Sequence, residues 1–192
     1  SYPSLEAQVA GISDDIAYNN HDLEDGLRAG LFSIRELIKI PILSDIIEKH
    51  LKNIKNYRRE VIISQIIRNL INLMVIDVIN NTNKNLKEAK PKSPNDIYKK
   101  DHLMVDFSKK MQVMDLQIKA FLKQNMYSHK RVIINTNRGR KIIGNLFKYL
   151  IKNPKKYISK ESFKLDQKER IIADFIAGMT DRYAINLYKK IK

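Results

Sequence analysis

The feature that most constrains the fold is a long apolar stretch between Tyr57 and Lys87. Apolar residues recur there at helical spacing, which predicts one long α-helix. They form a wide stripe, made of Ile62, Ile66, Ile67, Leu70, Leu73, Met74 and Val78. Others cover much of the remaining circumference, namely Val61, Ile63, Ile71, Val75, Ile76 and Ile79. A helix that is apolar nearly all round is expected in the middle of a fold, buried by its neighbours.

The rest of the chain also follows a helical pattern. Only six glycines and five prolines punctuate it, and no period-2 strand pattern persists, so we predict an all-α fold. Pro41 is expected to stop one helix, Ser44 to cap the next, and Thr180 or Asp181 to cap the last. A loop is expected over 87–100, and only 127–137 could form a short strand. The other predicted helices cover residues 4–20, 31–40, 45–55, 109–127, 137–152, 167–177 and the segment after 181.

Composition narrows the class of protein. At 192 residues the chain can bury roughly 70% of the surface that it exposes when unfolded, so it needs no disulfides or structural metal to be stable. It has no cysteine, which excludes a disulfide framework, a thiolate zinc site and a cysteine nucleophile. We found no apolar run long enough to cross a bilayer and no signal peptide at the start. We therefore expect a soluble, intracellular protein in the cytoplasm, without membrane contact.

Charge is distributed unevenly. Residues 1–30 hold six carboxylates and one basic side chain, whereas the formal charge of the whole chain is +15. The stretch between Asp115 and Glu161 holds 12 lysines and arginines and no carboxylate. Clustered acid suits a cation or hydroxyl groups, and a basic remainder suits phosphates, free or in nucleic acid. The chain is also rich in Ile, Asn and Lys, and AT-rich coding alone can produce that bias.

The first predicted helix carries the candidate chemistry. Asp14, Tyr18 and Asp22 follow i, i+4, i+8 spacing and share one face. The opposite face is apolar, with Leu5, Val9, Ile12, Ile16 and Leu23. Small residues at 7 and 11 leave room for a ligand, and carboxylates can hold a metal or accept hydrogen bonds from sugar hydroxyls. We expect the three residues to line one cleft. The alternative is a solvent-exposed face with capping aspartates.

Three segments resemble one enzyme family. Residues 4–26, SLEAQVAGISDDIAYNNHDLEDG, resemble a segment of the deoxyguanosinetriphosphate triphosphohydrolase (dGTPase) family of HD-domain phosphohydrolases. Residues 177–184, AGMTDRYA, resemble the C-terminal signature of that family. Residues 67–71 and 74–79 fit its intervening long helix. The matches follow the family order and span nearly the whole chain. The resemblance implies a helical HD-type bundle around a long central helix.

The resemblance also assigns roles to the three residues. It implies that Asp14 is a metal ligand, that Tyr18 packs on the deoxyribose, and that Asp22 binds the 3′-hydroxyl. The family's other metal ligands, a histidine and a His-Asp dyad, lie upstream of the matched segment. His21 and Asp22 form an HD dipeptide at the wrong position to be that dyad. His50, His102 and His129 are isolated and have no ligand spacing.

We therefore expect residues 1–192 to be a single C-terminal portion of a longer enzyme. Residues 1–30 would be its acidic active-site helix and residues 31–192 its basic helical body. One aspartate cannot make a catalytic metal site, which needs about three protein ligands. The part of the HD fold that carries the dyad would be missing, and these residues alone are expected to be inactive.

The resemblance implies a reaction and several partners. The intact enzyme would use a divalent metal, such as Mn, Mg or Fe, to hydrolyse a deoxynucleoside triphosphate into a deoxynucleoside and triphosphate. dGTP is the expected substrate, and homo-oligomers and single-stranded DNA are expected partners. Candidates for binding the triphosphate are Arg58, Arg59 and Arg68, because arginine suits phosphate through bidentate bonding. The alternative function is a basic helical module for nucleic-acid binding or oligomerisation.

Overall fold

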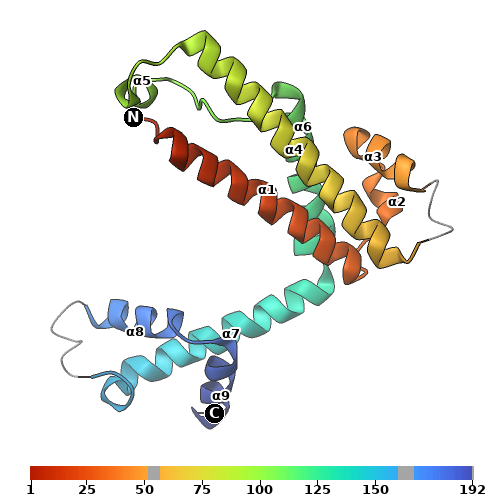
Figure 1. The fold of residues 1–192 in the computed structure, drawn as a ribbon. Helices are drawn as coiled ribbons and strands as arrows, with labels where there is room; N and C mark the ends of the chain where they lie inside the picture. The colour runs from red at the N-terminus through yellow and green to blue at the C-terminus, as the bar shows by residue number, and fades with distance from the viewer. Residues whose placement is uncertain (52–56, 160–166, 192) are drawn as a thin grey trace. The chain divides into compact units, whose positions relative to one another are not determined.

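The computed structural model describes residues 1–51, 57–159 and 167–191 (Figure 1). Every regular element within these ranges is helical and none is a strand, which confirms the predicted all-α class. The chain divides into two compact units, Ser1–His129 and Lys130–Lys192. The sequence pattern predicts a single portion and does not mark this boundary. We describe each unit by itself.

Helix α1 (Leu5–Arg28) begins the first unit, with Ser4 as its N-cap. The Ser4 side chain accepts a hydrogen bond from the backbone amide of Ala7 at 3.3 Å, which satisfies one of the free amides of the first turn. After the helix ends, Gly30 adopts φ +66°, a left-handed conformation that glycine tolerates without strain. The helix buries both apolar and polar side chains, including Gln8, Ile16, Asn19, Asn20, Leu23 and Leu27.

Helix α4 (Arg59–Ala89) is the long helix that the sequence predicts, and it lies beside α1 (Figure 1). Leu70 and Met74 are fully buried, as expected. Its buried stripe is Ile62, Ile63, Ile66, Ile67, Leu70, Met74 and Val78. The expectation of burial all round is wrong, because Val61, Val75, Ile76 and Ile79 are exposed. Neighbouring helices of this unit cover only one side of α4.

By length and composition α4 is also apolar enough to cross a membrane, alone among the described helices. The sequence has no uninterrupted apolar run of this length, because polar residues such as Arg68, Asn72 and Asp77 lie within the stretch, but the mean hydropathy of an 18-residue window is still high. Core helices have the same composition, and seven residues of α4 are buried within the unit. The absence of membrane contact stays a prediction.

Two short helices, α2 (Ile34–Leu37) and α3 (Pro41–Leu51), lie between α1 and α4 in the chain. Pro41 was expected to stop a helix, but it is the first residue of α3. A proline at this position loses nothing, because the first amides of a helix have no partner within the helix. Ser44 therefore does not cap the helix. It lies inside α3, where its hydroxyl donates to the Pro41 carbonyl at 2.6 Å.

The expected loop over 87–100 contains helix α5 (Pro94–Tyr98). Side chains from α1 and α4 then hold the irregular segment before α6. The Gln8 carbonyl oxygen accepts from the amides of Met104 and Val105 at 2.8 and 3.0 Å. Asn85 donates to the Met104 carbonyl at 3.0 Å. These bonds satisfy backbone groups that have no helical partner.

Helix α6 (Lys109–Leu122) continues into a π-helical turn, η2 (Lys123–Tyr127). This agrees with the predicted helix over 109–127, except for the change in winding. π-Helical turns are rare and often lie at functional sites.

The second unit is built on α7 (Lys130–Lys152). The expected strand over 127–137 is wrong, because most of that stretch is the first part of this helix. Its run of three β-branched residues does not belong to the core of this unit, because Ile133 is 42% and Ile134 57% exposed. Helices α8 (Lys168–Ala177) and α9 (Asp181–Ile191) pack on α7. Thr180 caps α9, as its hydroxyl accepts from the Tyr183 amide at 3.3 Å. The core of this unit includes Leu146, Leu150, Ile172 and Leu187.

Candidate functional site

The candidate site lies on the exposed face of α1. Because α1 is continuous, Asp14, Tyr18 and Asp22 follow one another on successive turns, as the spacing predicts. Asp14 is exposed, Tyr18 is 60% exposed and Asp22 is half-buried. Among the described residues no side chain forms an ion pair with Asp14. The Asp14 carboxylate at the start of this row is therefore accessible to a ligand, whereas the Asp22 carboxylate at its end already has a hydrogen-bond partner.

The predicted apolar face of α1 is only partly correct. Ile16 and Leu23 are buried, but Val9 is 49% exposed. Asn19 and Asn20 are buried instead, because each has a hydrogen-bond partner inside the unit. The buried face is thus rotated towards polar residues that a hydrophobic wheel assigns to solvent.

Tyr127 joins the site from the opposite side, and sequence reasoning missed it. Its hydroxyl donates a hydrogen bond to the Asp22 carboxylate. The π-helical turn η2 carries Tyr127, so the change in winding at the end of α6 contributes to its position. Burial raises the pKa of Tyr127, and the hydrogen bond and charge of Asp22 raise it further, with smaller contributions from Tyr18. Two tyrosines and a carboxylate therefore meet at the C-terminal half of α1.

Buried polar contacts hold α6 against α1. Asn19 donates to Asp115 at 3.0 Å, and both side chains are buried. Lys119 bridges Asp115 at 2.8 Å and Asp15 at 3.1 Å. Burial alone would lower the pKa of Lys119, but hydrogen bonds and charge from the two aspartates outweigh burial and raise it. These contacts fix the distance between α1 and the helix that leads to Tyr127.

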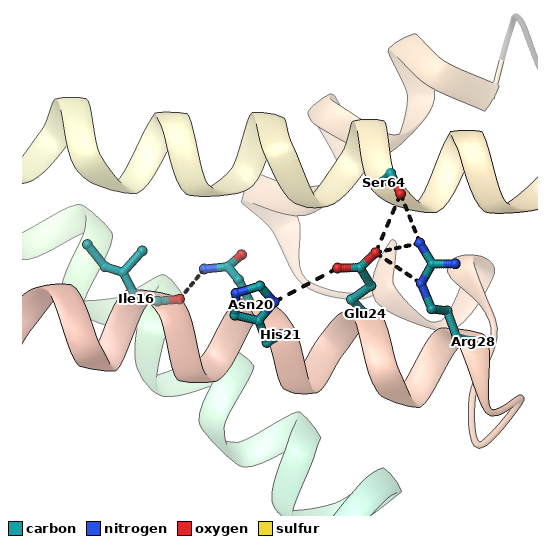
Figure 2. A network of polar contacts seen from close by, with 6 residues as sticks. All are labelled: Ile16, Asn20, His21, Glu24, Arg28 and Ser64. Atoms are coloured by element: carbon teal, nitrogen blue, oxygen red, sulfur yellow. Dashed lines mark hydrogen bonds and ion pairs between the residues drawn. The ribbon is translucent and has the colours of Figure 1, made fainter.

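A second polar network ties the C-terminal part of α1 to α4 (Figure 2). Arg28 donates to Glu24 through Nε at 3.0 Å and through Nη2 at 2.6 Å. Its Nη2 also donates to Ser64 of α4 at 3.0 Å. His21 lies 4.0 Å from Glu24 and is exposed. Asn20 donates to the Ile16 carbonyl of the same helix at 2.7 Å (Figure 2). It also donates to Met74 Sδ of α4 at 3.2 Å, so it is part of the packing between the two helices.

The three candidate arginines lie in different surroundings. Arg59 donates to the Leu27 carbonyl at 2.8 Å, which satisfies a free carbonyl at the end of α1. Arg58 is the exposed N-cap of α4, and Arg68 is exposed further along that helix. Among the described contacts, only that of Arg59 reaches α1. Phosphate binding by any of the three stays a prediction.

The described residues do not complete a metal site. Within them no group of three or more His, Asp or Glu side chains is placed to hold an ion. Asp14 can therefore supply one ligand and no more. His102 pairs with Asp101 on the surface at 2.5 Å, and the side chain of His50 lies outside the described residues.

That Asp14, Tyr18 and Asp22 line one cleft, open on one side, stays a prediction. The cavity of about 600 Å³ beside α1 lies on another side of the helix. Its lining includes Asp15, Lys119 and the Asp115 of the α6 contact. Asp14 and Tyr18 form a row with Asp22 along α1, in which the first two are exposed and Asp22 is half-buried. Tyr127 covers this row only at the Asp22 end.

Comparisons with known proteins give a consistent result. Residues 105–190 match the phosphohydrolase-associated domain. The chain is 51% identical over 189 residues to a deoxyguanosinetriphosphate triphosphohydrolase-like protein of Pelagibacter ubique, covering 98% of the chain and 50% of that relative. A protein with the same description from Parvibaculum lavamentivorans is 35% identical over 196 residues, covering 100% of the chain and 50% of the relative. One from Leptospira interrogans is 36% identical over 194 residues, covering 98% and 51%.

These similarities confirm the resemblance inferred from residues 4–26 and 177–184. They extend over nearly all of the chain, so both compact units share the relationship. The chain spans about half the length of the curated relatives that it matches.

Proposed function

Because this chain is a homologue of the deoxyguanosinetriphosphate triphosphohydrolase-like proteins, we propose that the intact protein is a dGTPase-like phosphohydrolase. It would hydrolyse a deoxynucleoside triphosphate to a deoxynucleoside and triphosphate, with dGTP as the preferred substrate. Homo-oligomer formation and binding of single-stranded DNA are further proposals, which rest on the family resemblance alone.

The observation that carries the proposal is the group of Tyr18, Asp22 and Tyr127. A carboxylate has about four positions at which it can accept hydrogen bonds. Tyr127 uses one of them on Asp22, which leaves others for the 3′-hydroxyl of a deoxyribose. The exposed ring of Tyr18, one turn earlier on α1, offers an apolar surface on which the sugar can pack. This combination suits a sugar better than a bare phosphate, which a carboxylate would repel.

We infer that Asp14 binds the divalent metal of the intact enzyme, with its other ligands supplied from outside these 192 residues. When bound, such a metal would supply a nucleophilic water and neutralise charge on the phosphates. The residues of this chain would orient the substrate beside the metal. Asp22 would bind the 3′-hydroxyl of the substrate, and Tyr18 would pack on its deoxyribose. Arg58, Arg59 and Arg68 remain candidates for the triphosphate.

The test uses two substrates and two variants of the intact protein. Asp22→Ala should weaken the binding of dGTP by about 1.5–3 kcal/mol, the range for a hydrogen bond to a charged group. 2′,3′-Dideoxyguanosine triphosphate lacks the 3′-hydroxyl and should bind the unmodified enzyme with a similar loss. If Asp22 contacts that hydroxyl, the two losses should not add. Asp25→Ala removes an exposed carboxylate of the same helix and should leave the binding of both substrates unchanged.

Two results would contradict the proposal. If Asp22→Ala discriminates between the two substrates as strongly as the unmodified enzyme, Asp22 does not contact the 3′-hydroxyl. If Asp14→Ala retains full metal content and activity, Asp14 is not a ligand.

The isolated 192 residues should release no triphosphate from dGTP with manganese, and sustained release would show that the site lies elsewhere in the chain.

A further inference from the structure

The η2 turn lies between a firmly packed helix and Tyr127. Ile118 and Leu122 of α6 are both fully buried. The ring of Phe121, beside Leu122, packs edge-on against Phe32 with centroids 4.9 Å apart. Because these contacts prevent α6 from rotating about its own axis, the winding of η2 decides in which direction the Tyr127 side chain leaves the helix.

The winding of η2 changes that direction by a large angle. An α-helix turns by about 100° per residue, and a π-helical turn holds one residue more than an α-helical turn. Residues after η2 are therefore turned back by about 100° relative to a continuous α-helix. Tyr127 has the direction that Met126 would have if α6 continued without the change. With α-winding the tyrosine hydroxyl would be carried away from Asp22, to which it donates a hydrogen bond in the structure.

Two side chains hold η2 in the wider winding. The Ser128 amide donates to the Lys123 carbonyl, five residues back, at 3.1 Å, and the Ser128 hydroxyl donates to the same oxygen at 2.8 Å. Asn125 donates to the Phe121 carbonyl at 3.0 Å, which gives this carbonyl at the end of α6 a donor that does not depend on the backbone. No glycine or proline occurs in η2 to prevent α-winding. The turn therefore depends on these side-chain bonds.

The position of Tyr127 matters for the carboxylate that it contacts. Its hydroxyl donates to Oδ2 of Asp22, and among the described contacts no other donor reaches this carboxylate. Without Tyr127 the carboxylate could therefore turn about its terminal side-chain torsion, which has a broad range. With Oδ2 held, Oδ1 is left in a fixed position to accept a hydrogen bond from a ligand.

We propose that Asn125 and Ser128 are positioning residues of the candidate site. By holding η2 in its π-helical winding they place the Tyr127 hydroxyl on Asp22, and so fix the carboxylate that receives the 3′-hydroxyl of the substrate. Neither side chain reaches α1 in the described contacts, so both act through Tyr127. The role of Asp22 towards the 3′-hydroxyl rests on the proposed function, whereas the placement of Tyr127 rests on the geometry of η2.

The first measurement follows the ionisation of Tyr127 in the intact protein. Tyrosine isotopically labelled at Cζ reports ionisation by its chemical shift, and Tyr127→Phe identifies the signal. Burial and the hydrogen bond to Asp22 raise the pKa of Tyr127, so the unmodified protein should keep it neutral above pH 10. In the double variant Asn125→Ala/Ser128→Ala, η2 should adopt α-winding, and Tyr127 should ionise at about pH 10 like an ordinary tyrosine.

Two control variants remove bonds of the same kind elsewhere in the chain. Asn153→Ala removes a side-chain bond to the carbonyl four residues earlier, at the end of α7. Ser44→Ala removes a hydroxyl bond to a backbone carbonyl in α3. Neither should change the ionisation of Tyr127.

A deletion separates the winding from other effects of the substitutions. Gln124 is an exposed residue of η2, and its removal shortens the segment by the one residue that the π-helical turn adds. A tyrosine one position earlier in a continuous α-helix has the direction that Tyr127 has now. Deleting Gln124 in the double variant should therefore restore ionisation well above pH 10.

The second measurement compares the binding of dGTP and its 2′,3′-dideoxy analogue. The preference for dGTP should fall by about tenfold in the double variant, the size of one hydrogen bond to a charged group, and should return when Gln124 is also deleted. If ionisation behaves as expected but the preference never changes, η2 positions Tyr127, and only the proposed role of Asp22 towards the 3′-hydroxyl is rejected.

Two outcomes would overturn the proposal. One is a double variant with native circular dichroism in which Tyr127 still stays neutral above pH 10. The other is a double variant in which Tyr127 ionises early and deletion of Gln124 does not reverse the change. If the double variant does not fold, Ser128→Ala alone is measured in the same way, because it removes one of the two bonds to the Lys123 carbonyl.

Discussion

Gly26 and Gly11 lie in the same helix, yet alanine should have opposite effects at the two positions. A Cβ at Gly26 would overlap Cε1 and Cζ of the Phe32 ring. That ring is 4% exposed and packs edge-on against Phe121, with centroids 4.9 Å apart, so it cannot move freely. A Cβ at Gly11 has no other heavy atom within 4 Å among those described. The first substitution overfills the core, whereas the second meets only open space.

The magnitude follows from two opposing terms. Replacing a helical glycine by alanine stabilises a helix by up to about 1 kcal/mol, and this gain applies to both variants. Overpacking of a core costs about 1–3 kcal/mol, and this cost applies only to Gly26→Ala. The free energy of unfolding should therefore rise for Gly11→Ala and fall for Gly26→Ala. The difference between the two variants isolates the steric cost.

Urea unfolding followed by circular dichroism measures both free energies. Hydrogen exchange at the amides of α1 identifies the transition of the first unit, because the chain has two compact units. Adding Phe32→Leu to Gly26→Ala should recover part of the loss by removing the overlapping ring atoms. Equal stability of Gly26→Ala and Gly11→Ala would refute the reasoning, since it would mean that the Phe32 ring moves aside without cost.

Three further predictions concern the contacts around α1. Tyr127 should stay protonated in an absorbance titration above pH 10, where ordinary tyrosines ionise. Because folding raises its pKa, the stability that it contributes is present below pH 10 and is lost as the pH rises further. Asp22→Asn should lower the pKa of Tyr127 towards that of an ordinary tyrosine. Asp115→Ala should destabilise the fold by about 1–3 kcal/mol by leaving the buried Asn19 amide unpaired. Changing both residues to Leu should cost less, and an equal or larger cost in urea unfolding would contradict this. Met74→Ala should cost about 2–5 kcal/mol because the side chain is fully buried, and a cost below 1 kcal/mol would place it outside the core.

Much of the local structure could be predicted because it depends on residues near in sequence. The extent of α4 follows from a period of 3.6 in its apolar residues, and the start of α1 from Ser4 as an N-cap. The common face of Asp14 and Asp22 follows from helical geometry alone. Local sequence was misleading at Pro41, which starts a helix as readily as it ends one. It was also misleading at 127–137, where β-branched residues belong to α7.

The sequence by itself therefore determined the all-α class, most of the helices and a row of candidate residues on α1. Only the tertiary structure decided what surrounds that row. Tyr127 reaches Asp22 across 105 positions of the chain, and Asp115 reaches Asn19 across 96. No periodicity carries such information, because a helix repeats its own geometry and contains nothing about the helix opposite. For the same reason the pattern of α4 showed that the helix is apolar, while packing decided that one side is buried and that Ile79 is left exposed.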